Sequence, residues 1–317
     1  MAHDDAVSGA SLERALAVVR AGAAGEAAGV FGPDSQFWRI NREAIVFLGA
    51  GRALLLQLAH PWVAAAIAEH SDAGADPIGR FHRTFGVVYA MTFGSLDRAL
   101  AAARALHARH ETVTGTMAAP AGPFPGGSAY RANEIAALRW VFATLIDTAL
   151  LAYATVLPAP SARERERYYD DSRLFAALFG LDPADLPADW AAFAAYNEAM
   201  ARSDILTVSA VARDIARQLL FGKVGPLPVP RWYRAVTAAM LPQRLRDGFD
   251  LPFDQRERKR AARAIARIRR LYPLMPARLR YVAPYHEAMA RLSGRARGDT
   301  LTRLLNRFWI GRPSLEP

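Results

Sequence analysis

Apolar and polar positions along this chain follow the period of an α-helix. Apolar residues recur every three to four positions in several long segments, while the strict alternation typical of half-buried strands is scarce. Together with alanine-rich stretches, which favour helix by propensity, this pattern predicts an all-α protein of about a dozen helices. The periodic segments are residues 12–19, 44–58, 84–93, 135–153, 172–179, 204–221, 260–271 and 299–309.

Local signals predict where some of these helices begin and end. Ser161 and Glu164 have the spacing of a capping box, so a helix should start there and stop near Gly180. The Gly- and Pro-rich stretches at residues 114–130 and 222–230 interrupt the periodicity and are predicted to be loops.

The apolar faces on either side of residues 114–130 are too wide for the two parts to stand alone. We therefore expect one helical bundle over residues 35–317, preceded by a helical and partly flexible extension over residues 1–34. The most apolar window, residues 45–68, is long enough to span a bilayer. Because polar residues and a proline interrupt it, we expect a buried pair of helices instead.

Composition narrows the class of protein. The formal net charge is +10, but Lys223 and Lys259 are the only lysines among 40 basic residues. Coding bias explains a chain so rich in arginine and alanine better than nucleic-acid binding does. The positive charge still favours anionic ligands or surfaces. The absence of cysteine excludes disulfides, thiolate metal sites and a cysteine nucleophile. The N-terminal stretch lacks the pattern of a signal peptide, and we expect a cytoplasmic protein without a transmembrane segment.

One short stretch, RFHRT at residues 80–84, carries an unusual set of side chains. Arg80, Arg83 and Thr84 have the spacing i, i+3, i+4, which places them on one face of a helix. An apolar run follows at once. On a solvated helix we would expect acidic residues to alternate with these two guanidinium groups. On a core helix we would not expect such charges at all.

A second candidate lies at residues 103–115, where His107 and His110 are three positions apart and Glu111 follows. A zinc site on a helix requires H-E-x-x-H, which this spacing does not match, and the repeated Glu-x-x-His pairs of di-iron proteins are also absent. A macrocyclic metal cofactor needs only one or two axial side chains and an apolar slot between helices. One of these histidines would suffice for that.

Other features have ordinary explanations. The chain has no G-x-S-x-G elbow, no P-loop and no G-x-G-x-x-G after a strand. The glycines of GAGR, residues 49–52, suit close helix packing, and Asp170 and Asp171 suit a solvated helix face. The basic segment at residues 256–270 has the pattern of an amphipathic helix with a wet basic face, although it leaves peripheral membrane contact open.

Several spaced segments resemble one family, that of the MpaB oxygenase and the rubber oxygenase called latex clearing protein, formerly a domain of unknown function. The resemblance covers roughly residues 35–290. The segments that carry it are LLLQLAHPWVAAAIAEHSD (54–72), DPIGRFHRTFGVVYAMTFGS (76–95), HETVTG (110–115), LRWVFATLIDTALLAYATV (138–156), RERYYDDSRLFAALFGL (165–181) and LPADWAAFAAYNEAM (186–200).

The resemblance implies a globin-like helical bundle around a b-type haem that activates dioxygen. The family's proximal histidine lies in a segment similar to H-x-x-V-x-G, which selects His110, with Val113 and Gly115, over His107. The family's distal Arg-x-x-Lys-Thr group corresponds to Arg80, Arg83 and Thr84. On this basis Arg80, Arg83 and Thr84 are the candidate catalytic residues, His110 is the candidate iron ligand, and Arg80 and Thr84 are further haem contacts.

Two departures from the family pattern bear on the chemistry. The rubber oxygenase has a lysine, able to ligate iron, where this chain has Arg83, and a guanidinium has no free lone pair for a metal. The active-site glutamate of the rubber oxygenase has no clear counterpart; Glu69 is nearby in sequence, in a loose alignment. The first departure predicts that Arg83 is not an axial ligand and that the distal iron site is open or water-bound. The second argues against polyisoprene as the substrate.

The sequence therefore favours a haem-b-dependent oxygenase acting with dioxygen on a small apolar or terpenoid substrate. Three alternatives stay open: a cofactor-free tailoring enzyme on the same fold, a haem-binding sensor or carrier without turnover, and an all-α interaction protein. In the last case the two arginines would simply pair with acidic residues, for which the candidates are Glu69, Asp72 and Asp76. The sequence does not define the oligomeric state.

Overall fold

The computed structural model describes residues 5–71, 76–224, 227–295 and 298–316. These residues form sixteen α-helices, thirteen of them with seven or more residues, so the prediction of an all-α protein with about a dozen substantial helices is confirmed. Asp72, one of the acids considered as a partner for the arginines, lies outside the described residues.

The first ten α-helices are α1 (Gly9–Gly22), α2 (Gln36–Asn41), α3 (Ala50–Leu58), α4 (Pro61–His70), α5 (Pro77–Phe93), α6 (Leu96–Glu111), α7 (Ile135–Val156), α8 (Ala162–Ala177), α9 (Trp190–Arg202) and α10 (Ala210–Phe221). The remaining six are α11 (Arg231–Met240), α12 (Gln243–Gly248), α13 (Gln255–Leu271), α14 (Ala277–Arg280), α15 (Ala283–Leu292) and α16 (Thr300–Ile310). Three short 3₁₀ helices are η1 (Ala44–Gly49), η2 (Pro183–Asp185) and η3 (Tyr272–Leu274).

The two stretches predicted to be loops each contain a short antiparallel hairpin. In the first, β1 (Thr114–Thr116) pairs with β2 (Ala129–Arg131), and in the second, β3 (Lys223–Val224) pairs with β4 (Leu227–Pro228). The prediction was right for the Gly- and Pro-rich tip of the first hairpin and wrong for its ends. Threonine and tyrosine at those ends favour the extended backbone of a strand.

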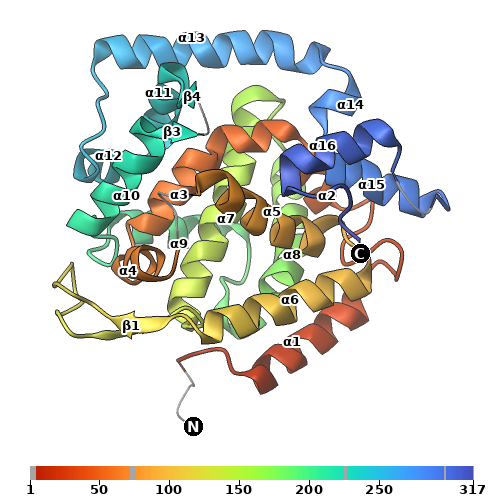
Figure 1. Ribbon diagram of the computed structural model, residues 1–317, viewed down its shortest axis with the longest axis horizontal. Coiled ribbons are helices and arrows are strands. Elements are labelled where there is room, and N and C mark those ends of the chain that lie inside the picture. The colour runs from red at the N-terminus through yellow and green to blue at the C-terminus, as the bar shows by residue number, and fades with distance from the viewer. Residues whose placement is uncertain (1–4, 72–75, 225–226, 296–297, 317) are drawn as a thin grey trace.

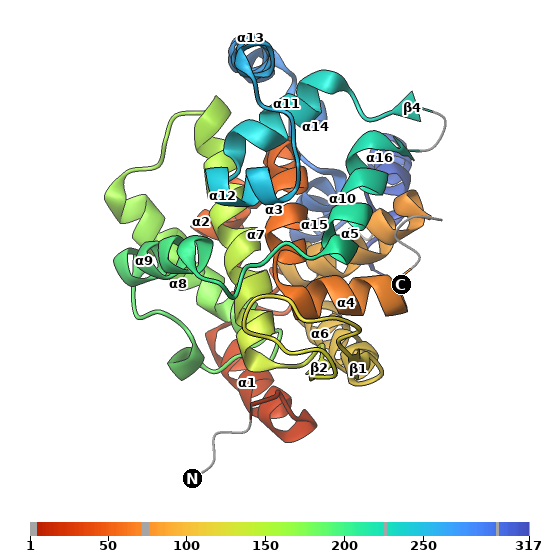
Figure 2. The ribbon, with the colours of Figure 1, turned by 90° about the vertical axis from the view of Figure 1, so that its left-hand side faces the viewer.

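The long helix α7 forms the centre of the molecule, with α8 and α9 on one side and α3 on the other (Figure 2). It is long and apolar enough to cross a membrane, but 61% of its apolar window is buried inside the protein, as is usual for a core helix. At the opposite end from α13, α1 packs on α6 and α8 through the buried side chains of Leu12, Leu16 and Val19 (Figure 1).

The apolar window at residues 45–68 folds as the predicted pair of helices. The stretch Ala44–Leu58, which comprises η1 and α3, meets α4 at an angle of 102°. His60 precedes the break and Pro61 occupies the first helical position of α4, where its missing N–H costs no hydrogen bond. After this turn, α4 packs against α10 and against strands β1 and β2.

The glycines of GAGR allow close packing, as predicted. A Cβ on Gly49 would overlap the Thr148 methyl of α7, and a Cβ on Gly51 would lie 2.6 Å from Oγ1 of Thr237 on α11. The neighbouring Arg52 is buried, with its guanidinium donating to Asp147 at 2.6 Å. These contacts fix α3 between α7 and α11.

Helices α13 and α8 agree with what the sequence predicts for them. In α13, Ile265 and Ile268 pack on the core while most of the arginines are exposed, which confirms an amphipathic helix with a wet basic face. The capping box of Ser161 and Glu164 is also present, and α8 ends shortly before Gly180.

The surface assignment of the Asp170–Asp171 pair is right for the first residue and wrong for the second. Asp170 is exposed, whereas Asp171 is half-buried and accepts a hydrogen bond from the backbone N–H of Phe37 at 3.0 Å. Burial raises the pKa of the Asp171 carboxyl. Asp171 therefore holds the first turn of α2 against α8, a role that only the tertiary contact reveals.

Candidate functional site

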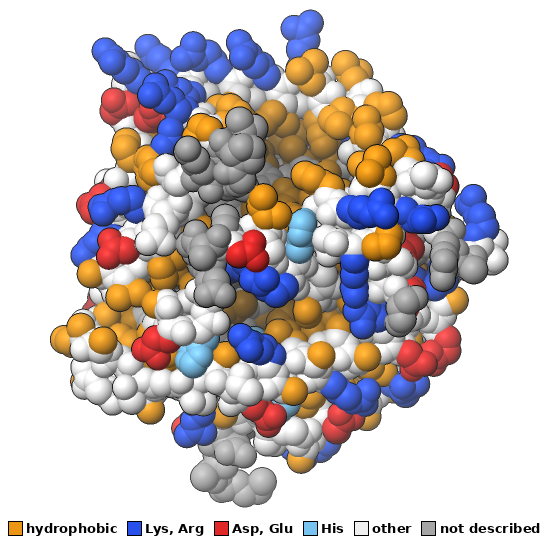
Figure 3. Space-filling view, in the orientation of Figure 1, with side chains coloured by type: hydrophobic (Ala, Val, Ile, Leu, Met, Phe, Trp, Pro, Cys, Tyr) orange, Lys and Arg blue, Asp and Glu red, His pale blue; other side chains and the backbone are white. Residues whose placement is uncertain are grey.

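Helices α4, α5, α6 and α7 enclose a cavity of about 830 Å³ that opens to solvent beside the first turns of α5. Figure 3 shows the hollow on this face of the molecule. A volume of this size lies within the range of about 300–1,000 Å³ typical of small-molecule and cofactor sites. Its walls are mainly apolar, with Ile67, Val87, Leu106, Leu138, Val141 and Leu145 among the lining side chains.

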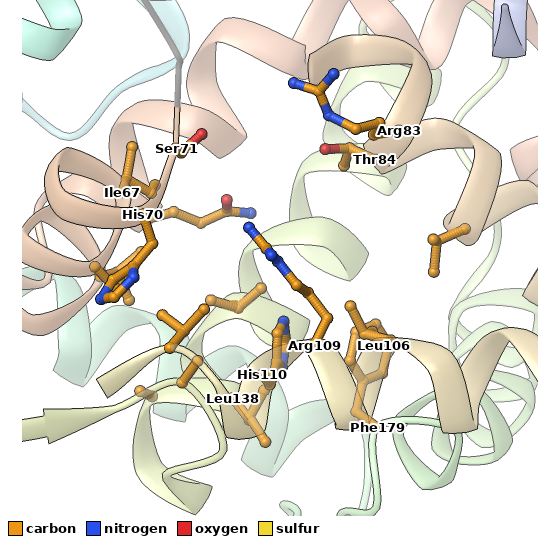
Figure 4. A pocket seen from close by; sticks show the side chains of 18 of the residues that line it. Ile67, His70, Ser71, Arg83, Thr84, Leu106, Arg109, His110, Leu138 and Phe179 are labelled. Carbon is orange, nitrogen blue, oxygen red and sulfur yellow. The ribbon is translucent and has the colours of Figure 1, made fainter. Parts of the chain in front are cut away.

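The last turn of α6 places His110 in the cavity. The close view shows its ring rising from α6 into the cavity, with the Arg109 side chain beside it extending into the same space (Figure 4). His107, one turn earlier, does not line the cavity; it is buried, with Nε2 3.4 Å from Glu111. The two histidines that the sequence left as alternatives thus differ in their surroundings, and only His110 faces the open space.

Burial controls the protonation of His110. Desolvation lowers the pKa of its imidazole to about 4, against which a hydrogen bond with the Asn133 side chain acts weakly. At neutral pH the ring is therefore uncharged and keeps a lone pair on one nitrogen. A neutral imidazole is the form in which histidine ligates a metal.

The three residues singled out on α5 also line the cavity. Figure 4 shows Arg83 and Thr84 on the wall opposite His110. Asp76 caps the helix by accepting from the backbone N–H of Gly79 at 2.8 Å, which fixes the first turn. Arg80 lies deeper and donates to Ser71 Oγ at 3.2 Å, and burial lowers the pKa of its guanidinium. It stays protonated, because an arginine does not lose its proton in a protein.

Arg83 lies at the rim of the cavity. Its guanidinium pairs with Asp76 at 3.2 Å, and both side chains are more than half exposed. One of the acids considered as a partner thus does pair with one of the arginines. Among the described residues, Arg80 has the Ser71 hydroxyl as its hydrogen-bond partner and makes no ion pair.

Glu69 does not line the cavity. It accepts a hydrogen bond from the Tyr130 hydroxyl at 2.5 Å, which joins α4 to strand β2. Gly115 lies beneath this pair: a Cβ there would come within 2.6 Å of the Glu69 carboxylate and would overlap the Tyr130 hydroxyl. Val113, two residues before it, lines the cavity. The glycine of H-x-x-V-x-G in this chain therefore lets the hairpin close against α4.

The structure adds polar cavity residues that the sequence did not single out. Arg109 and Arg131 contribute two more guanidinium groups, and His70 a second imidazole that is in contact with the Thr114 carbonyl at 3.0 Å. Arg109 adjoins His110 in the sequence, which was an available signal. Arg131 comes from strand β2, and nothing in its local sequence marks it. Among the described lining residues, four arginines stand against one carboxylate, that of Asp76, which gives this part of the cavity a cationic character.

The described residues contain no group of three His, Asp or Glu side chains that could hold a metal ion by themselves. His110 is a lone imidazole on a mainly apolar wall, with arginines around the same cavity. This arrangement defines the class: a helical protein with a cofactor-sized cavity that opens to solvent and is lined by several arginines.

Residues 37–271, about three quarters of the chain, match the family described as ER-bound oxygenase mpaB/B'/Rubber oxygenase, catalytic domain. The chain belongs to this oxygenase family, and the matched range agrees with the resemblance seen over roughly residues 35–290. No curated protein and no solved structure is significantly similar to the chain.

Proposed function

We propose that this protein is a haem-b-dependent oxygenase that uses dioxygen to oxidise a small apolar or terpenoid substrate in the cavity between α4, α5, α6 and α7. Membership of the oxygenase family supports the reaction class. The observation that carries the cofactor assignment is His110, a histidine kept neutral by burial and aimed into an apolar cavity of sufficient volume.

The residues present fit a haem. A b-type haem is a flat apolar group with one iron and two carboxylates, so it requires an axial imidazole, apolar walls and cations near one edge. His110 supplies the imidazole, and side chains such as Leu106 and Leu138 supply the walls. Arg80, Arg109 and Arg131 supply guanidinium groups that suit carboxylates because they donate two parallel hydrogen bonds.

Bound haem would supply the activation of dioxygen, and the protein would supply position and environment. His110 would hold the iron through its neutral nitrogen. Arg80 and Thr84 would place hydrogen-bond donors on the wall of the cavity that α5 forms. The apolar walls would bind the substrate and limit water. Arg83 would not be an axial ligand, because its guanidinium has no free lone pair.

An absorption spectrum of the purified protein, before and after dithionite, tests this proposal. A Soret band that shifts on reduction is expected, and pyridine extraction should identify haem b. His110→Ala should abolish the band, whereas His70→Ala, the matched control on the same cavity, should retain it. The absence of haem from the folded wild-type protein after supply of haem would refute the proposal and favour a cofactor-free tailoring enzyme.

Turnover needs a separate measurement. Oxygen uptake by the haem-loaded protein with terpenoid alkenes should rise above the rate without substrate. A stable haem complex that consumes no oxygen with any such substrate would instead indicate a sensor or carrier. An interaction protein would show neither haem nor turnover.

A further inference from the structure

One face of the molecule exposes large apolar side chains on two neighbouring segments. The first segment runs from the end of α13 through η3 to α14, where Leu274 is 77% exposed. The second is α16, whose residues 301, 304 and 308 have the spacing i, i+3, i+7 and form one outward stripe. We call these side chains the α14–α16 face: Leu271, Leu274, Met275, Leu279, Leu301, Leu304 and Phe308.

The two segments form one continuous surface. Arg278 of α14 makes an ion pair with Asp299, the residue that caps the N-terminus of α16. In the space-filling view hydrophobic side chains gather over the region of α14 and α16 (Figure 3), on the side of the molecule where Figures 1 and 2 place α16 beside α5. Exposed apolar side chains that are contiguous in this way mark an interaction site.

Basic side chains border the apolar ones. Arg303 and Arg307 are exposed one position before Leu304 and Phe308, so they flank the apolar stripe along α16. Arg267 and Arg270 are exposed in the last turns of α13, just before Leu271. An apolar stripe with arginines along its edge is typical of helices that lie in the interface of an anionic membrane, with guanidinium groups reaching the headgroups.

The α14–α16 face adjoins the mouth of the cavity. His82 of α5 is in contact with the backbone carbonyl of Phe308 at 3.0 Å. Gly311 packs directly against the His82 ring: a Cβ on this residue would lie only 2.8 Å from His82 Nδ1. The same first turns of α5 carry Asp76 and Arg83 at the rim of the cavity. The outermost turn of α5 also exposes Ile78.

We propose that the α14–α16 face docks on an anionic lipid bilayer, with its apolar side chains among the acyl chains and its arginines at the headgroups. A second copy of the chain is the less suitable occupant. A symmetric dimer on this face would bring its arginines, among them Arg303 and Arg307, close to their own copies, and like charges at an interface repel. An anionic surface instead complements both the local arginines and the net charge of +10.

Docking would place the cavity mouth next to the lipid, where an apolar substrate is most concentrated. This delivery of substrate rests on the proposed function. The docking does not, since it requires only the surface side chains. Vesicle binding should therefore be the same with and without haem, and an absorption spectrum that fails to show haem would refute the proposed function alone.

Vesicle co-sedimentation tests the docking. The probes are vesicles of phosphatidylcholine alone and of phosphatidylcholine mixed with phosphatidylserine. The wild-type protein should bind the mixed vesicles, and raised salt should weaken binding. The double variant Leu304→Ser/Phe308→Ser should bind at least about tenfold more weakly, because two side chains no longer enter the lipid. The matched control Val18→Ser/Leu151→Ser removes two exposed apolar side chains elsewhere and should bind as the wild type does.

A second pair of variants tests the charge. Arg303→Gln/Arg307→Gln should lose most of the preference for anionic vesicles, while Arg163→Gln/Arg167→Gln, which changes two exposed arginines of α8, should keep it. This arm decides the matter if the apolar variant does not fold.

Three results would overturn the docking proposal. They are a folded wild-type protein that binds neither vesicle, α14–α16 variants that bind like their controls, and a wild-type dimer that these variants turn into monomers without loss of vesicle binding. The last result would assign the face to a second copy of the chain.

Discussion

The buried imidazole of His60 should make the stability of the fold depend on pH. His60 lies at the break between α3 and α4, is 2% exposed, and has no hydrogen-bond partner for Nδ1 among the described residues. The rings of Trp62 and Phe124 surround it, with centroids at 5.9 and 5.4 Å. Burial in this apolar setting lowers the pKa of His60 from 6.5 to about 4.

The two pKa values determine the sign and the size of the effect. Between pH 6.5 and about pH 4 the unfolded chain binds a proton at this imidazole and the folded protein does not. The free energy of unfolding therefore falls as the pH falls through this window. Relative to pH 7.5, the loss from His60 alone is about 2 kcal/mol at pH 5 and about 3 kcal/mol at pH 4.

Urea unfolding followed by circular dichroism, at about pH 7.5 and about pH 5, measures this loss. His110 in the haem-free protein has the same direction of shift, so the wild-type protein alone does not separate the two histidines. His60→Gln should shrink the difference between the two pH values by about 2 kcal/mol.

Phe124→Leu is the matched control. It loosens the packing around the imidazole but keeps the titrating group, so it should lower stability at both pH values and retain most of the difference between them. If the wild-type protein and His60→Gln lose equal stability on acidification, His60 is not the buried neutral group described above.

Three further outcomes follow from specific contacts. Gly49→Ala should destabilise the fold by about 1–3 kcal/mol in urea unfolding, and Thr148→Ser added to it should restore much of the loss by removing the overlapping methyl group; no recovery would disprove the overlap. Arg83→Gln should change stability by less than about 1 kcal/mol in the same assay, because its ion pair with Asp76 is exposed, and a larger loss would mean that the pair is structural. Glu287→Gln should speed amide exchange near the C-terminus, because the buried carboxylate accepts hydrogen bonds from residues 306 and 314–316; unchanged exchange would show that the charge is not needed there.

The helices could be predicted from sequence because amphipathic periodicity is a local property. Where a helix buries one face, as α13 does with Ile265 and Ile268, the pattern specifies both the element and the side that packs. Prediction was poorer where contact with a segment far away in the sequence determines the local structure. Nothing near Asp171 shows that the first turn of α2 will lie against it, and nothing near residue 129 shows that β2 will find β1 as its partner.

The residues of the candidate site also divide into those that the sequence predicts and those that only the folded structure reveals. Spacing alone places Arg80, Arg83 and Thr84 on one face, and the family pattern points to His110. The packing of α5 on α6 brings the two sets to one cavity. Arg131 enters the site only because the β1–β2 hairpin folds back on α4, and Gly115 permits that approach. A contact between two elements that are far apart in the sequence cannot be recognised from either stretch alone.

Arg80 can face the cavity because aromatic rings along α5 anchor the helix to its neighbours. Phe81, Phe85 and Tyr89 follow one another at intervals of four residues and pack on Phe47 and its neighbour Trp309, with ring centroids 4.6–6.4 Å apart. Aromatic pairs at such distances contribute about 0.5–1.5 kcal/mol each beyond the area they bury. This packing fixes the rotation of α5. The face with Arg80 and Thr84 is then held over the cavity, so its guanidinium group stays directed at the space where a ligand would lie.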